Sequence, residues 1–326
     1  MADTTDSLIF ANKLQIHYWF SDKSHTMDAL VHNKCERELL EITKAVASLC
    51  GADIKLETEP SAKGGLKCWI TIIPKSEKKT PPSKIDLVTT MVNAVLATPM
   101  HTSVSHIVGQ LIDSLFADRE VSEEQKEQMR LDIAQLKSEA EGKIQVLDQS
   151  NLLKKRRSNF YDALTKYKKM KSISVVMTDA FRRPITEEQM VTREGFKNFI
   201  LSSDHLKPIV LENVLIEIIS PVLTKGKYKW KGVYNGSLIS FSMKSEEFIS
   251  LVQSGKVEFK SGTTINCTLE IEKKINSEGL EKITSYNIVR VGSYFENGKS
   301  VDTTEGRQQK QKPIVPKKQL DLFGNY

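Results

Sequence analysis

The sequence predicts an α+β protein with an N-terminal β-α-β-β unit, a helical middle, a mainly antiparallel β domain and a disordered tail. Two observations favour this fold class. Apolar residues recur at a helical period through much of residues 27–167, whereas residues 172–294 hold short runs typical of strands. Polar segments and changes of composition separate these regions, so we expect four parts, at 1–83, 84–171, 172–296 and 297–326.

The N-terminal part opens with residues 13–20 (KLQIHYWF), which predict a strand entering the core. The segment 27–49 follows with an apolar stripe at helical spacing, and Gly51 is placed to end that helix. Two further strands are expected at 53–59 and 66–73, before a proline-containing linker. The helical stripe consists of Val31, Cys35, Leu39, Ile42, Val46 and Leu49.

The middle of the chain predicts helices. Residues 84–116 fit a helix that breaks at Pro99, and a second helical pattern runs from Ser122 to Tyr167 with a bend expected at Ser150–Asn151. Its apolar seam suits a helical hairpin or a two-stranded coiled coil, and the coiled coil would make the protein a homo-oligomer through helix 122–167. The seam consists of Met129, Ile133, Leu136, Ala140, Ile144 and Leu147.

The third part predicts a small barrel or a curved antiparallel sheet. The pair Asn235-Gly236 between two strand-like runs is a hairpin signal, and a short helix is expected at 246–254. Tyr228, Trp230 and Tyr234 alternate on one strand; we interpret them as core residues in preference to a ligand-binding face. The expected strands are 173–178, 214–219, 228–234, 238–243, 257–260, 265–275 and 285–291.

Positive charge is concentrated in two segments. The whole chain carries +6, yet residues 154–171 hold eight Lys or Arg and one acid, and 306–318 hold five and none. Such concentration is typical of contact with phosphate backbones, although the acidic stretch 118–141 could instead neutralise the first segment within the fold. The predicted nucleic-acid contacts are Lys154, Lys155, Arg156, Arg157, Lys168 and Lys169.

A group of acids and one histidine near the N-terminus is a candidate active site. Asp28, His32 and Glu36 lie one turn apart along a single helix side, and Glu57 and Glu59 alternate onto one face of the next strand. Carboxylates on a helix and a strand can hold a divalent metal, as in many nucleases. No established catalytic signature is present, so solvated side chains are the alternative, and whether the protein is an enzyme stays open.

The chain ends in a short apolar peptide behind a polar, basic segment. Gln319, Leu320, Asp321, Leu322 and Phe323 follow one another. This run resembles the sliding-clamp-binding motif of bacterial replication and repair proteins, with agreement at all five positions. The resemblance implies a bacterial sliding clamp as partner, with Leu322 and Phe323 in its apolar groove. Docking of the peptide on its own chain is the alternative.

The rest of the chain faintly resembles uncharacterised bacterial proteins of mobile and antiviral-defence elements, and no residue role follows from this. No window approaches the roughly 18 apolar residues of a membrane helix. The four cysteines are widely spaced, which favours the cytoplasm. The leading expectation is a DNA-associated accessory protein recruited through the sliding clamp. The alternatives are a metal-dependent nuclease or related hydrolase, and a non-enzymatic interaction protein, as in phage defence.

Overall fold

The computed structural model describes residues 11–22, 26–59, 66–76, 80–115, 123–224, 226, 228–296 and 299–311. These residues form two compact units. Unit 1 lies within residues 1–203 and also includes 275–280; unit 2 lies within 204–274 and 281–326. The division therefore differs from the predicted boundaries at 83 and 171, because strands on both sides of those positions pair in one sheet.

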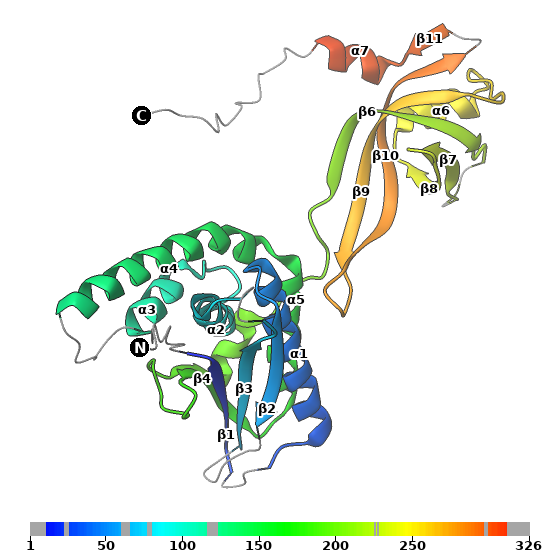
Figure 1. The fold of residues 1–326 in the computed structure, drawn as a ribbon. Helices are drawn as coiled ribbons and strands as arrows, with labels where there is room; N and C mark the ends of the chain where they lie inside the picture. Colours follow the sequence, from blue (N-terminus) through cyan, green and yellow to red (C-terminus); the bar gives the residue numbers. More distant parts are fainter. Residues whose placement is uncertain are drawn as a thin grey trace. The chain divides into compact units, whose positions relative to one another are not determined.

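Unit 1 is built on a five-stranded sheet with the order β2-β3-β1-β4-β5 (Figure 1). The central strand β1 is antiparallel to both β3 and β4. This order is that of the ferredoxin-like split β-α-β arrangement, with four helices where that arrangement has its second helix. The strands are β1 (Lys13–Phe20), β2 (Ile54–Glu59), β3 (Leu66–Pro74), β4 (Met170–Thr178) and β5 (Gln189–Thr192).

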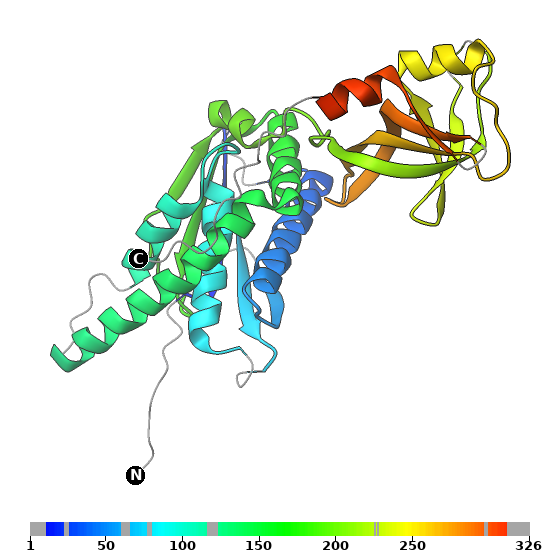
Figure 2. The ribbon, with the colours of Figure 1, turned by 90° about the horizontal axis from the view of Figure 1, so that it is seen from above.

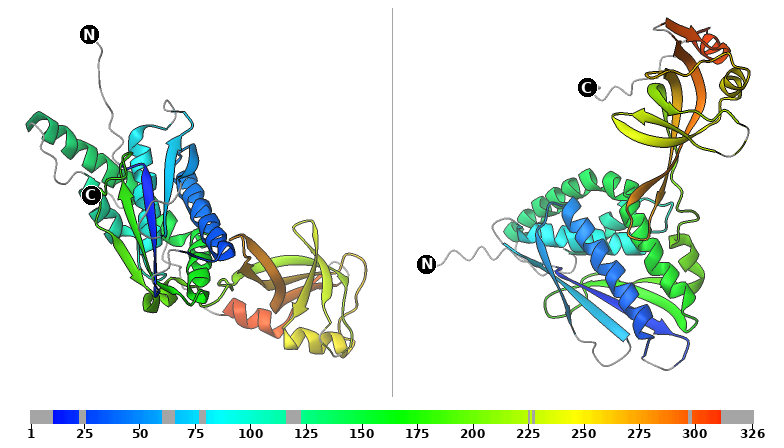
Figure 3. Two further views of the ribbon diagram at one scale, coloured as in Figure 1. Left: turned by 90° about the horizontal axis from the view of Figure 1, so that it is seen from below. Right: turned by 90° about the vertical axis from the view of Figure 1, so that its right-hand side faces the viewer.

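Helices cover one face of this sheet (Figure 3). Leu14 and Ile16 of β1 and Ile70 and Ile72 of β3 face them and are buried in one core. The helices are α1 (Ala29–Leu49), α2 (Pro82–Ala97), α3 (Ser105–Leu115), α4 (Glu123–Gln149) and α5 (Asn151–Lys166), and a 3-10 helix, η1 (Arg193–Phe199), follows β5.

The predicted break in the long helical segment is confirmed. Helix α4 ends at Gln149 and α5 begins at Asn151, with the Ser150 hydroxyl accepting a hydrogen bond from the Leu153 amide at 3.3 Å. The apolar seam of α4 turns into the core of unit 1, where Leu136 and Leu147 are buried. The seam that suggested a coiled coil is thus covered by the chain's own helices.

Unit 2 contains a closed ring of five strands. Strand β6 pairs with β7, β7 with β8, β8 with β10, and β9 closes the ring by pairing with both β10 and β6. Strands β8 and β10 are parallel, and a helix lies between β8 and β9 in the chain. This is the topology of the OB fold. The elements are β6 (Ile209–Ser220), β7 (Trp230–Tyr234), β8 (Ser237–Met243), α6 (Glu246–Gln253), β9 (Thr264–Ile275) and β10 (Glu281–Glu296).

The barrel contains the predicted hairpin, but the predicted aromatic core is confirmed only for Trp230: Tyr234 is half-buried and Tyr228 is exposed. Asn235 and Gly236 have φ angles of 47° and 73°, as a two-residue hairpin turn with left-handed central residues requires. Trp230 is buried beside Phe241 and Phe248. The strand expected at 257–260 is wrong, because that segment runs from α6 to β9 without forming a strand.

A further strand and helix correct the expectation of disorder beyond residue 297. Strand β11 (Lys299–Asp302) pairs with β10, and helix α7 (Thr304–Gln311) lies next to α6 (Figure 2). The Glu247 carboxylate of α6 accepts hydrogen bonds from the first two amides of α7, at 2.6 and 2.8 Å. A Cβ on Gly306 would lie 1.9 Å from the carbonyl oxygen of Gly292. Helix α7 therefore packs so closely on β10 that only glycine fits at position 306. The clamp-like peptide 319–323 lies outside the described residues.

Candidate functional site

Three of the five predicted catalytic residues line one pocket of unit 1. His32 and Glu36 reach it from α1, and Glu59 reaches it from β2. The pocket is open and has a volume of about 310 Å³. Cys68 and Tyr18, which the sequence did not suggest, also line it. The structure thus gathers part of the predicted set, together with one thiol and one phenol.

The other two predicted residues have different roles. Asp28 is the N-cap of α1, and its carboxylate accepts hydrogen bonds from the amides of Leu30 and Val31 at 2.9 and 3.1 Å. Glu57 forms an exposed ion pair with Lys55 at 2.6 Å. An N-cap carboxylate satisfies helix amides that lack a partner. Asp28 is therefore one turn before His32 because it caps the start of the helix, and its carboxylate is used by the helix amides.

His32 and Cys68 form a close pair in the pocket. The His32 Nε2 lies 3.1 Å from the Cys68 Sγ. Burial, and next the charge of Glu36, raise the pKa of the Cys68 thiol to about 11. The thiol is therefore protonated at neutral pH. A nucleophilic cysteine needs a thiolate, which this environment disfavours.

Glu59 is held by two cations at the edge of the pocket. It pairs with Lys13 of β1, and the Arg182 Nε donates to it at 2.8 Å. The Thr71 hydroxyl donates to the same carboxylate at 2.9 Å. These contacts, the Lys13 hydrogen bond above all, lower the pKa of Glu59 to about 2. Arg182 also lies over the ring of Trp69, 4.5 Å from its centroid. Glu59 is thus a permanent anion used in structural ion pairs.

No metal centre forms in the described part of the chain. Among those residues, no group of three His, Cys, Asp or Glu side chains is arranged to hold a metal ion. A metal-dependent cleavage mechanism has no support in this geometry and stays an untested prediction.

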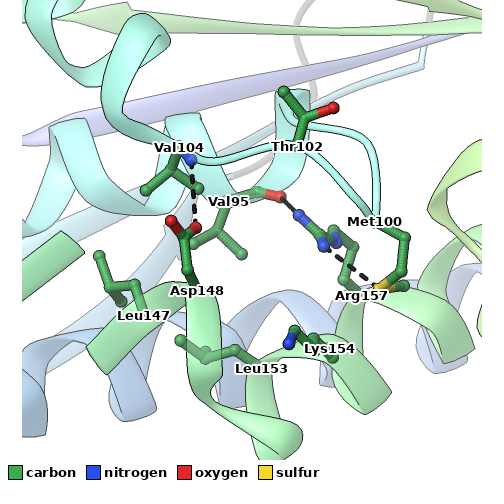
Figure 4. A pocket seen from close by; sticks show the side chains of 9 residues that line it. All are labelled: Val95, Met100, Thr102, Val104, Leu147, Asp148, Leu153, Lys154 and Arg157. Carbon is green, nitrogen blue, oxygen red and sulfur yellow. Dashed lines mark hydrogen bonds between the residues drawn. The ribbon is translucent and has the colours of Figure 1, made fainter. Parts of the chain in front are cut away.

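Part of the predicted basic patch belongs to the interior of unit 1. Arg157 of α5 is buried, and it donates to the carbonyl oxygen of Val95 at 3.0 Å (Figure 4). It also donates to the carbonyl oxygen of Thr98 at 2.6 Å. Burial lowers its pKa to about 10. The adjoining cavity measures about 20 Å³, which is room for a single water. Arg157 therefore ties the end of α2 to α5 and is not available to a phosphate.

Arg156 is likewise used within the fold. It pairs with the buried Glu38 of α1 at 3.2 Å. Lys154 and Lys155 are half-buried, and Lys169 pairs with Asp22 at 2.8 Å. Acids on α1, rather than the expected acidic stretch 118–141, neutralise Arg156. Of the six predicted contacts, Lys168 keeps an exposed side chain without an ion pair to another described residue.

A second basic segment lies on the barrel of unit 2. Residues 221–231, which comprise the loop after β6 and the first two residues of β7, hold four lysines and no acid. Lys229 and Lys231 are exposed, and neither forms an ion pair within the described part of the chain. Tyr228, next to them, is 67% exposed, whereas Trp230 between the two lysines points into the core. Sequence reasoning missed this segment, because alternate lysines are ordinary on a solvated strand face and only the closed barrel gives them a position.

Comparison with known proteins identifies no relative: no family model, no curated protein and no solved structure matches the chain. None of the helices in the described ranges is long and apolar enough to cross a membrane. The function is therefore proposed from the residues of this chain alone.

Proposed function

We propose that this protein is a DNA-associated accessory protein that is recruited to replicating DNA through the sliding clamp. In this account the barrel of unit 2 contacts a single DNA strand, and the C-terminal peptide Gln319–Phe323 binds the clamp. The body needs no strong DNA site of its own, because tethering raises its local concentration near DNA.

The observation that carries the proposal is the basic, aromatic edge of an OB-type barrel. In barrels of this topology the surface of the second and third strands, with the loop between the first and second, binds oligonucleotides. Here that loop and β7 carry Tyr228, Lys229 and Lys231 on the outside. Topology alone does not assign a function. Exposed lysines beside an exposed ring add the chemistry that a strand requires, which is charge for phosphates and a surface for bases.

The clamp part of the proposal is supported by the sequence. Leu320, Leu322 and Phe323 are apolar residues at the end of a polar segment, and the motif matches at each position. The structure bears on its reach, because α7 is packed on the barrel as far as Gln311. Seven residues, 312–318, separate α7 from Gln319. Fully extended, they span at most about 25 Å.

The DNA contact is tested with the double variant Lys229→Glu, Lys231→Glu. Binding of the full chain to a fluorescently labelled single-stranded oligonucleotide is measured by anisotropy. Each phosphate contact that is lost reduces the number of counterions released on binding. We therefore expect at least tenfold weaker binding, and a salt slope that is lower by about 1–2 units.

The control is Lys256→Glu, Lys299→Glu, which makes the same charge change on exposed barrel positions outside the β6–β7 segment. Equal loss of binding in both double variants would show a general effect of charge and would refute a site at β6–β7.

The clamp contact is tested by co-purification with a bacterial sliding clamp. The double variant Leu322→Ala, Phe323→Ala removes both groove-filling side chains, and we expect it to abolish retention. The variant Ile314→Ala, Val315→Ala removes comparable apolar surface from the same tail outside the motif, and it is expected to bind as the wild type does. If the wild type and the motif variant are retained equally weakly, the clamp proposal is lost.

A further inference from the structure

Trp19 stands at the end of β1 on the sheet face of unit 1 that the helices leave uncovered. Along β1, Leu14, Ile16 and Tyr18 face the helices, so His17 and Trp19 belong to the opposite face. Of the three tryptophans, Trp69 and Trp230 are 4% and 3% exposed, whereas Trp19 is 38% exposed. A large aromatic side chain is thus presented on the outside of a sheet.

The indole of Trp19 is fixed in position by its neighbours. Its Nε1–H donates to the Ser174 Oγ on β4 at 3.0 Å, and the Ser174 hydroxyl donates to Glu188. The His17 ring lies beside it with the centroids 3.8 Å apart and an interplanar angle of 35°. Ser174 and His17 are both buried. The polar atom of the indole is therefore satisfied inside the sheet, and its exposed part is a preorganised apolar surface, which reduces the entropy lost on binding.

Positive charge lies at the same end of the sheet. Trp19 is opposite Ser172 of β4, and the Ser21 amide donates to the Lys169 carbonyl at 2.8 Å, so the segment 166–171 runs beside the end of β1. This segment holds four lysines. Lys166 and Lys169 are paired with Asp162 and Asp22. Lys168 and Lys171 are exposed and form no ion pair with another described residue.

We infer that Trp19 is a base-stacking platform for single-stranded nucleic acid, with Lys168 and Lys171 contacting the backbone beside it. This inference rests on the proposed function and adds a second contact, in unit 1. A flat ring accepts any base, and bases in a single strand have free faces, whereas those of a duplex are already stacked. The strand positions around the indole include the polar residues Ser172, Thr192 and Lys67. Met190, the β5 partner of Ser174, is apolar and 53% exposed, so the neighbouring lysines, rather than a wholly polar surface, favour a charged polymer.

The test uses the intrinsic fluorescence of the full-length protein. Because Trp69 and Trp230 are buried, stacking of a base on Trp19 is expected to quench the exposed part of the emission as a thymidine oligonucleotide is added. In Trp19→Phe that quenching disappears. In Trp19→Ala the oligonucleotide is expected to bind roughly tenfold more weakly, which corresponds to the loss of one stacked base.

The control is Leu131→Ala, which removes an exposed apolar side chain from α4 and is expected to bind as the wild type does. Single-stranded DNA, single-stranded RNA and duplex DNA of equal length are compared. Thermal unfolding shows whether Trp19→Ala folds; if it does not, the quenching lost in Trp19→Phe decides.

Wild-type affinity in folded Trp19→Ala, or quenching that persists in Trp19→Phe, overturns the inference. Equal quenching by duplex and single strand does so as well. If binding then still depends on Lys229 and Lys231, the proposed function stands without the Trp19 platform. If the wild-type protein binds none of the three nucleic acids, both the Trp19 inference and the proposed DNA contact are refuted.

Discussion

Glu59 shows how one predicted catalytic carboxylate is used by the fold. Lys13, Arg182 and Thr71 surround it, and their contacts hold its pKa near 2 against an ordinary value of 4.5. A carboxylate with a pKa near 2 is not protonated at neutral pH, so it has no proton to donate, and it is too weak a base to be an efficient proton acceptor. The ion pairs of Glu59 instead stabilise the fold, because they join β2 to β1 through Lys13 and to the turn after β4 through Arg182.

The pH dependence of stability tests this assignment. Because folding lowers the pKa of Glu59, its contribution is present above about pH 4.5 and is lost as the pH falls towards 2. The variant Glu59→Gln is expected to lower the free energy of unfolding at neutral pH by at most about 3 kcal/mol. That difference should shrink steadily in denaturant titrations repeated from pH 5 down to acid-unfolding conditions. A difference that is independent of pH would contradict the ion-pair role.

The roles of single residues were harder to predict from the sequence than the helices and strands were. Helical spacing put Asp28, His32 and Glu36 on one side of α1, but spacing cannot distinguish a cap from a ligand. The partner of His32 is Cys68, which is 36 residues away and becomes adjacent only through the β2–β3 hairpin. The burial of Arg157 was equally hidden, because four consecutive basic residues look the same whether they face water or the core.

At the scale of elements, long periodic segments were predictable and polar ones were not. The strand at 13–20, the helix ending at Leu49 and the bend at Ser150–Asn151 all occur as expected. Helix α7 was missed because its sequence, TEGRQQKQ, has no apolar stripe. It is held by Glu247 and by the close approach of Gly306 to Gly292, and both contacts join residues far apart in the chain.

The packing of α7 is tested with Gly306→Ala. The added methyl group would meet the Gly292 carbonyl, so the variant is expected to loosen α7 and destabilise unit 2 by about 1–3 kcal/mol. Hydrogen exchange of the amides in 304–309 should become faster. In the control Gly109→Ala the new methyl group meets no atom within 4 Å, and exchange in α7 should stay unchanged. Unaltered exchange in Gly306→Ala would mean that α7 does not depend on this contact.

The domain boundaries illustrate why strand pairing resists prediction. Residues 172–178 were expected to open the β domain, yet β4 pairs with β1, more than 150 positions earlier in the chain. Alternation of side chains predicts that a strand exists and which residues share a face. It contains no information on the neighbouring strand, because any apolar strand satisfies the same backbone hydrogen bonds.

The whole protein is proposed to make three separate contacts: through the barrel segment at Lys229 and Lys231, through the Trp19 face and through the terminal peptide. Each is small, and none is expected to bind tightly alone. Linked contacts gain affinity through effective concentration, provided that the linker lets them engage together. The seven residues between α7 and Gln319 make that linker short, so the barrel is expected to act close to the clamp.

The most direct measurement of this claim compares the affinity of the full-length protein for a sliding clamp alone with its affinity for the same clamp loaded on primed single-stranded DNA. The account predicts binding at least roughly 100-fold tighter on the loaded clamp. The Leu322→Ala, Phe323→Ala variant and the Lys229→Glu, Lys231→Glu variant should each lose that gain. Equal affinity of the wild-type protein for the free and the loaded clamp would contradict the account.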